Sequence, residues 1–210
     1  RIMVAISTPV AQAAKNTIKD IPVVYADVTD PVEAGLVSDN PNSNITGSSD
    51  KQDLSLMLQL AKQLLPSAKK VGVLYSTAEA NDLSLVNMLI KNGQELGLEV
   101  ISVPVEHTRD VVTRMKLFKG KVDFIYTGSS GAIQASLPAI ASTAQALQLP
   151  LFNFNGEEVI THTALASYGV SHKQVGANAA IIIDKLLNGE KAGNIKPTYP
   201  TEEDHKAFIS

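Results

Sequence analysis

The sequence contains no cysteine and no tryptophan among its 210 residues. The absence of cysteine excludes disulfides, thiolate metal ligands and a cysteine nucleophile. Phenylalanine and tyrosine raise the aromatic share to only 5%. A hydrophobic core and any binding site must therefore be built mostly from aliphatic and small side chains.

Excess positive charge and long apolar runs are also missing. The formal net charge is −3, which gives no electrostatic reason to expect nucleic acid or an anionic membrane surface as a partner. No apolar run approaches the roughly 20 residues of a membrane span. Arg1 leads directly into a strand-like run, so we expect no cleavable signal segment in this chain.

Signals for catalysis or metal binding are weak. There is no nucleotide-binding G-x-G-x-x-G and no Walker loop, and "GSSG" at 128–131 does not match the G-x-S-x-G nucleophile motif. The acidic run at 202–205 is typical of a solvated face. We therefore expect no enzyme, no cofactor and no metal site. The four histidines lack metal-ligand spacing and are expected at the surface: His107, His162, His172 and His205.

Strand-like apolar runs alternate with amphipathic segments along the chain. Apolar residues recur at helical spacing in 54–65, 86–96 and 172–186. Near-continuous apolar strands between helices are typical of a parallel sheet that is covered on both faces. The sequence thus predicts an α/β protein. The strand-like runs are "MVAI", "IPVVYADV", "KVGVLYS", "LEVISVPV", "VDFIYTG" and "LPLFNFN".

Residues 4–28 and 124–155 share one order of elements: strand, hydroxyl-rich turn, alanine-rich helix, proline, strand. This shared order of elements predicts two α/β lobes that are built alike. The segment 40–50, dense in Asn, Ser and Gly, is the best boundary between the two lobes. We expect the chain to return to the first lobe at "LASYGVSH", residues 165–172. We therefore predict lobe one from 1–47 plus 166–210, and lobe two from 48–165.

The predicted strand ends are rich in hydroxyl and amide groups. Ligands of parallel sheets bind outside the carboxyl ends of the strands, and a helix start with free N–H groups favours a carboxylate. Any single Ser or Thr at such a junction is usually only a helix cap, but several that point the same way favour a site. The turns are Ser7-Thr8, Asp27 to Asp30, Ser76-Thr77, Thr127 to Ser130 and Asn153 to Asn155.

Several motifs, taken in order, resemble one family. They are "VAISTPVAQAA", "IPVVYADVTDPVEAGLV", "NITGSSD", "LLPSAKKVGVLYSTAEAN", "LPLFNFNGEEV" and "ALASYGVSHKQVGANAA". Together they resemble the substrate-binding proteins of bacterial ABC transporters, in the family that includes tryptophan- and other aromatic-amino-acid-binding lipoproteins. The resemblance extends from the start of the chain to about Gly189.

The resemblance implies a type I periplasmic-binding-protein fold: two Rossmann-like lobes with parallel sheets and a small ligand clamped between them. It also implies an extracytoplasmic location, in the periplasm or on a lipid anchor, and a membrane permease as partner. Family members carry further βα units before the "TP" strand, so we expect an incomplete N-terminal lobe. Strand Ile2–Ile6 should then lie inside a sheet, its neighbour missing, exchanged from another chain of an oligomer, or supplied by the tail.

The resemblance also implies site residues. We expect Asp30 or Glu79 to accept from a ligand ammonium, because these acids lie closest to the strand-end turns, and Tyr75, Tyr126, Phe154 or Tyr168 to cover its side chain. The sequence departs from the family at Gly128 to Ser130 and at Phe154-Asn155, where relatives often carry an Asp. The residues expected at the ligand are Ser7, Thr8, Thr29, Asp30, Ser76, Thr77, Glu79, Asn81, Thr127, Asn153, Asn155 and Tyr168.

Three functions are open at this point. The leading one is a non-catalytic receptor that delivers a small ligand, with an aromatic amino acid favoured, to a permease. A sensor domain of the same fold would use the same clamp for signalling. An enzyme on a Rossmann-like sheet is disfavoured because the chain lacks a nucleotide fingerprint and a nucleophile–base pair.

Overall fold

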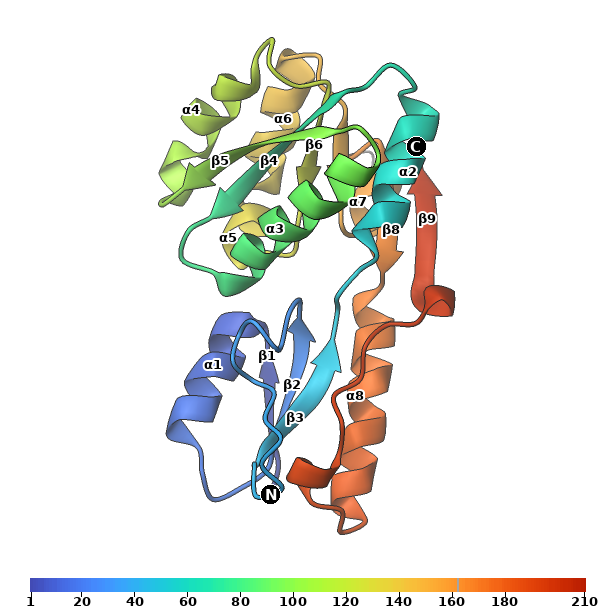
Figure 1. The fold of residues 1–210 in the computed structure, drawn as a ribbon. Coiled ribbons are helices and arrows are strands. Elements are labelled where there is room, and N and C mark those ends of the chain that lie inside the picture. The colour runs from blue at the N-terminus through green and yellow to red at the C-terminus, as the bar shows by residue number, and fades with distance from the viewer. Residues whose placement is uncertain (162) are drawn as a thin grey trace. The chain divides into compact units, whose positions relative to one another are not determined.

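The chain folds into two compact units in a computed structural model that describes residues 1–161 and 163–210. Unit 1 comprises residues 1–52 and 170–205, and unit 2 comprises residues 53–169 and 206–210. The chain therefore passes from one unit to the other three times. Figure 1 shows the elements of both units.

The unit boundaries differ from the lobe boundaries that we expected from sequence. Residues 48–52 belong to unit 1, and residues 166–169 belong to unit 2. The last five residues also belong to unit 2, although the whole tail was expected in lobe one. The physical reason is strand pairing, because the tail forms a strand, β9 (His205–Ile209), beside β8 (Ala166–Val170).

Unit 1 is built on a three-stranded parallel sheet. Its strands are β1 (Met3–Ile6), β2 (Val23–Val28) and β3 (Ile45–Ser49), in the order β1-β2-β3. Helix α1 (Thr8–Thr17) covers one face and α8 (His172–Leu187) covers the other. The expected α/β architecture with parallel sheets covered on both faces is confirmed.

The side chains of β2 alternate between the two layers of unit 1. Val23 and Tyr25 pack in the cluster that includes Ala11 of α1, whereas Val24 packs in the cluster that includes Val175 of α8. This alternation follows from the two-residue period of a strand. Because both faces are covered, the strand reads as a continuous apolar run.

Strand β3 lies where the sequence predicted only a boundary segment. All five of its residues are buried. A Cβ atom on Gly47 would lie 2.4 Å from Cδ2 of Tyr25, so only glycine fits beside that ring. Thr46 and Ser48 donate side-chain hydrogen bonds to the carbonyls of Ile195 and Val175. Small polar residues thus form a buried strand because their hydroxyls are paired.

Strand β1 lies at an edge of its sheet in this chain. It pairs only with β2, and Met3, Val4 and Ile6 are 40%, 45% and 62% exposed. The tail does not supply a neighbour, since β9 belongs to the other sheet.

Unit 2 contains a six-stranded sheet in the order β5-β4-β6-β7-β8-β9. The pairs from β5 to β8 are parallel. Ser210 N–H donates to the Leu165 carbonyl next to β8, and the arrow of β9 runs opposite to that of β8 (Figure 1). The other strands are β4 (Lys70–Ser76), β5 (Glu99–Val105), β6 (Phe124–Thr127) and β7 (Leu151–Asn153).

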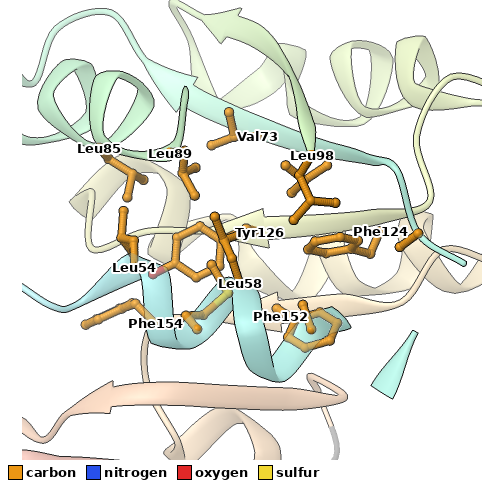
Figure 2. Close-up of a cluster of buried hydrophobic side chains, with 14 of the residues drawn as sticks. Leu54, Leu58, Val73, Leu85, Leu89, Leu98, Phe124, Tyr126, Phe152 and Phe154 are labelled. Carbon is orange, nitrogen blue, oxygen red and sulfur yellow. The ribbon is translucent and has the colours of Figure 1, made fainter. Parts of the chain in front are cut away.

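Helices cover both faces of this sheet. Helices α2 (Leu54–Leu64) and α3 (Ala80–Glu95) pack on one face, around the tilted ring pair Phe124 and Phe152 (Figure 2). Helices α4 (Val111–Met115), α5 (Gly131–Ala135) and α6 (Leu137–Ala146) pack on the other face. The remaining helical turns are α7 (Glu157–Ile160) and the 3-10 turns Thr108–Asp110, Lys116–Phe118, Ala192–Asn194 and Glu202–Asp204.

The helix ends follow from local side chains. Asp53 caps α2 by accepting from the N–H groups of Ser55 and Leu56 at 3.0 and 3.3 Å. Ser171 caps α8 by accepting from Gln174 N–H at 3.1 Å, but Gln174 turns to Asn178 and does not complete the expected capping box. Across residues 1–161 and 163–210, no helix combines the length and apolar character that crossing a bilayer requires.

Candidate ligand-binding site

The turn between β1 and α1 places an unusual residue pair at the first strand end of unit 1. Ser7 has a left-handed φ of 83° and makes no side-chain cap, while its N–H donates to the Ala26 carbonyl at 3.0 Å. Thr8 begins the helix and is 2% exposed. No described residue offers a hydrogen-bond partner to its buried Oγ1. The start of α1 therefore has an unused hydroxyl beside unsatisfied helix N–H groups.

The turn after β2 holds Thr29 and Asp30. Thr29 is buried, and its carbonyl accepts from Ser49 Oγ at 3.2 Å. Asp30 accepts from Glu33 N–H at 3.0 Å through Oδ1, and its Oδ2 lies 3.6 Å from Lys51 Nζ. Asp30 thus stabilises its own turn and already has a cationic partner.

Two further acids lie at these strand ends, and our residue-by-residue assignment missed their pairing. Asp27 and Asp50 interact through their side chains, and Thr29 also forms a side-chain hydrogen bond with Asp50. Burial, with the charge of Asp27 as the next cause, raises the pKa of Asp50 well above its ordinary value. Asp27 has a left-handed φ of 59° at a register shift in β2. The sequence signal was an Asp at the end of each of two adjacent strands.

In unit 2, Ser76 ends β4 and is joined to the first turn of α3. Its N–H donates to Asp82 Oδ2 at 2.7 Å. Burial raises the pKa of Asp82 to about 7, and the nearby charge of Glu79 acts in the same direction. Thr77, in contrast, is exposed, and its N–H donates to the Val105 carbonyl at 3.4 Å. Helix α3 begins at Ala80, so Thr77 lies in the turn before it.

Glu79 and Asn81 flank the start of α3. Glu79 Oε2 accepts from Gly131 N–H at 3.1 Å, so this acid joins the starts of α3 and α5. Asn81 is 7% exposed. Its Oδ1 is buried and finds no hydrogen-bond partner within the described ranges.

The ends of β6 and β7 carry a closed amide network. Asn153 Oδ1 accepts from Thr127 Oγ1 at 2.7 Å and from Gln134 Nε2 at 2.9 Å. Asn153 Nδ2 donates to the Asn155 carbonyl at 3.4 Å, and Asn155 Oδ1 accepts from Glu157 N–H at 3.0 Å. The structure therefore brings these predicted residues together as a support for the strand ends.

Comparison with known proteins assigns the chain to a family. A family model described as ABC transporter substrate binding protein matches residues 1–209. The chain belongs to this family. The resemblance read from its motifs is thus confirmed.

Two of the similar proteins are described with an aromatic amino acid. The chain is 35% identical over 199 residues to the tyrosine-binding protein of Clostridioides difficile (strain R20291), a match that covers 94% of this chain and 57% of that protein. An ABC domain in complex with L-Trp from Streptococcus pneumonia is similar with a TM-score of 0.91 and 28% identity. That match covers 99% of this chain and 72% of that chain.

A third relative was solved without ligand. It is the open structure of a substrate binding protein with adhesive properties from Clostridium difficile. Its TM-score is 0.70 at 30% identity, with 99% of this chain and 70% of that chain covered. The chain spans little more than half the length of the curated relative and about 70% of these two solved chains.

The aromatic residues expected to cover the ligand fall into two classes. Tyr126 and Phe154 are 1% and 4% exposed and belong to the core cluster under α2 and α3 (Figure 2). Their rings are therefore already packed against other core side chains. Tyr75 and Tyr168 are half-buried at the margin of the same cluster.

The histidines were expected at the surface, and the structure describes three of them. His107 and His172 are exposed and His205 is half-buried; His162 lies outside the described residues. Among residues 1–161 and 163–210 no group of three or more His, Asp, Glu or Cys side chains is arranged to hold a metal ion.

Proposed function

We propose that this chain provides the ligand-binding part of a substrate receptor for an ABC importer, and that its ligand is an aromatic amino acid. Family membership and the tyrosine- and L-Trp-binding relatives support the ligand class. The proposal includes an extracytoplasmic location, with a lipid anchor or in the periplasm, and a membrane permease that accepts the ligand.

One observation carries the ligand chemistry: the unused Thr8 hydroxyl at the start of α1. A buried hydroxyl without a partner costs free energy, and here it lies in the first turn of a ten-residue helix. The first N–H groups of a helix have no intrahelical partner and attract anions. We infer that the carboxylate of the amino acid accepts from Thr8 Oγ1 and from these N–H groups.

We infer that unit 2 contributes amide and aromatic groups. Asn81 has a buried, unpartnered side-chain oxygen in the first turn of α3, and an acceptor of this kind suits a ligand N–H group. Tyr75 and Tyr168 keep part of their rings exposed, so they suit the ligand's aromatic side chain. Each unit alone then offers only part of the ligand's partners.

Calorimetry with a panel of amino acids, peptides, sugars and nucleosides tests this function. We expect binding of L-tyrosine or L-tryptophan, loss of affinity in Thr8→Val, and unchanged affinity in Thr77→Val, whose position is exposed. The predicted loss is about 0.5–1.5 kcal/mol, as for one neutral hydrogen bond. Tight binding of a sugar or nucleoside with no response to any amino acid would contradict the proposed ligand class.

A further inference from the structure

The acids that the resemblance suggested as ammonium acceptors already have partners. Asp30 accepts from Glu33 N–H at 3.0 Å and lies 3.6 Å from Lys51 Nζ. Glu79 accepts from Gly131 N–H at 3.1 Å. A ligand cation would have to compete with these partners at either acid.

Asp27 and Asp50, in contrast, have unused oxygen atoms. Oδ1 of each is buried and meets no donor from the described part of the chain. Asp50 is only 4% exposed, so water cannot solvate its charge freely. The two carboxyl groups lie within hydrogen-bonding reach of each other. Carboxylates only accept hydrogen bonds, so this contact requires one proton, or a cation in its place.

The groups around this pair include a hydroxyl donor and a histidine. Thr29 donates to Asp50, which favours its ionised form. On α8, the half-exposed His172 has Nε2 3.8 Å from Asp27 Oδ1. Lys51 pairs with Asp30 instead. No Lys or Arg in residues 1–161 and 163–210 forms an ion pair with Asp27 or Asp50.

One member of the pair lies partly at the surface. The Asp27 side chain is 24% exposed, whereas Asp50 lies deeper. The backbone of Asp27 is left-handed, with φ 59°, at the bulge between Ala26 and Val28. Such a conformation costs free energy for a non-glycine residue and persists where surrounding structure enforces it, often at ligand sites.

We propose that Asp27 and Asp50 bind a monovalent cation, the primary ammonium group of the amino-acid ligand, in exchange for the proton that they share when empty. The ligand's identity rests on the proposed function; the carboxyl pair does not. An ammonium group brings three N–H donors, which suits two facing carboxylate oxygens. The displaced proton passes to the buffer, so charge at the pair is conserved. A free alkali ion would satisfy the same chemistry.

Calorimetry of the purified protein tests the exchange directly. L-tyrosine is titrated at pH 7 in buffers of different ionisation enthalpy, which reports the protons released for each ligand bound. We expect release approaching one proton, and an affinity that falls as the pH is lowered, because protons then compete for the pair. The analogue 3-(4-hydroxyphenyl)propanoate, which lacks the ammonium group, should release none and bind more weakly.

Two variants separate charge from shape. Asp50→Asn keeps the volume and removes the shared proton, so proton release should vanish and L-tyrosine affinity should fall roughly thirtyfold or more. Asp27→Asn should act alike, because asparagine tolerates the left-handed backbone. Asp30→Asn is the control: its acid is paired with Lys51, so proton release should remain. Circular dichroism confirms that each variant is folded.

A second arm replaces the ligand with sodium chloride and, as a reference, tetramethylammonium chloride. Proton release on adding sodium alone, abolished by Asp50→Asn, would assign the pair to a free alkali ion. L-tyrosine binding without proton release, and with unchanged affinity in Asp50→Asn and Asp27→Asn, would overturn the cation site and leave the proposed function intact. No binding of any amino acid would refute the function, and the sodium arm alone would then decide the site.

Discussion

Thr127 Oγ1 donates a hydrogen bond of 2.7 Å to Asn153 Oδ1, so side chains as well as the sheet join the ends of β6 and β7. Both residues are fully buried, and Gln134 Nε2 donates to the same oxygen at 2.9 Å. The strand ends of unit 2 are therefore held by a satisfied polar network, which rigidifies a site more than a single contact would.

Removing the acceptor of this network should cost more stability than removing one donor. Asn153→Ala leaves the Thr127 and Gln134 donors without that partner, and we expect a loss of about 2–3 kcal/mol in the free energy of unfolding. Thr127→Val leaves one donor in place and should cost about 1 kcal/mol. Urea denaturation measures both, with Thr127→Ser as the control that keeps the hydroxyl. Equal losses in the two variants would contradict the network.

Gly47 should not tolerate any side chain. A Cβ at this position would lie 2.2 Å from the Tyr25 carbonyl oxygen and 2.4 Å from its ring, so Gly47→Ala should destabilise by about 3 kcal/mol or more. Gly176 is the matched control, an exposed helical glycine with open space around it. Gly176→Ala should stabilise by roughly 0.5–1 kcal/mol. Thermal unfolding that ranks the two variants the other way would refute the close approach of β3 to Tyr25.

Asp82 should make stability fall as the pH rises from about 4 to about 7. Its pKa is about 7 in the folded protein against an ordinary 3.8, because the buried carboxyl resists ionisation. Between these values the folded state holds a proton that the unfolded state releases, so raising the pH favours unfolding. Below 3.8 both states are protonated, and above 7 both are ionised.

Asp82→Asn isolates this effect, since asparagine still accepts from the Ser76 N–H. Relative to the parent protein, the variant should gain stability across that pH window, by up to about 4 kcal/mol. Denaturation at pH 4 and pH 7 measures the difference. A constant difference at both pH values would show that Asp82 titrates normally.

The Thr8 hydroxyl should lower the stability of the ligand-free protein and raise its affinity for the ligand. Thr8→Val removes a buried hydroxyl that has no partner among the described residues, so the ligand-free protein should keep or gain up to about 1 kcal/mol of stability. Thr46 is the matched control, because its buried hydroxyl donates to the Ile195 carbonyl at 2.9 Å. Thr46→Val should lose about 1–3 kcal/mol. Destabilisation by Thr8→Val as large as that of Thr46→Val would mean that the Thr8 hydroxyl is satisfied.

Sequence patterns captured those parts of the fold that depend on periodicity and caps. The apolar spacing and Pro66 located α2, and Gly97, with a left-handed φ of 70°, marks the end of α3. Strand β3 was missed because its core positions are filled by glycine and serine. Its burial depends on Tyr25 and α8, which are distant in sequence, so no local pattern could reveal it.

Only part of the candidate site could be predicted from the sequence, for the same reason. Strand-end chemistry pointed to Thr8 and Asn153, and the structure places them after β1 and at the end of β7. Which acid is already paired depends on long-range contacts such as Glu79 with Gly131, 52 positions apart. The Asp27–Asp50 pair likewise joins two strands that the sequence did not show to be neighbours.

The three chain crossings between the units have a consequence for the order of folding. Residues 53–169 supply nearly all of unit 2 in one continuous stretch, whereas the β1-β2-β3 sheet needs α8, which follows that stretch in the chain. Without α8, the face formed by Val24 and Ala26 lacks its cover. Unit 2 can therefore complete most of its structure from contiguous sequence, and unit 1 should be the later part to fold.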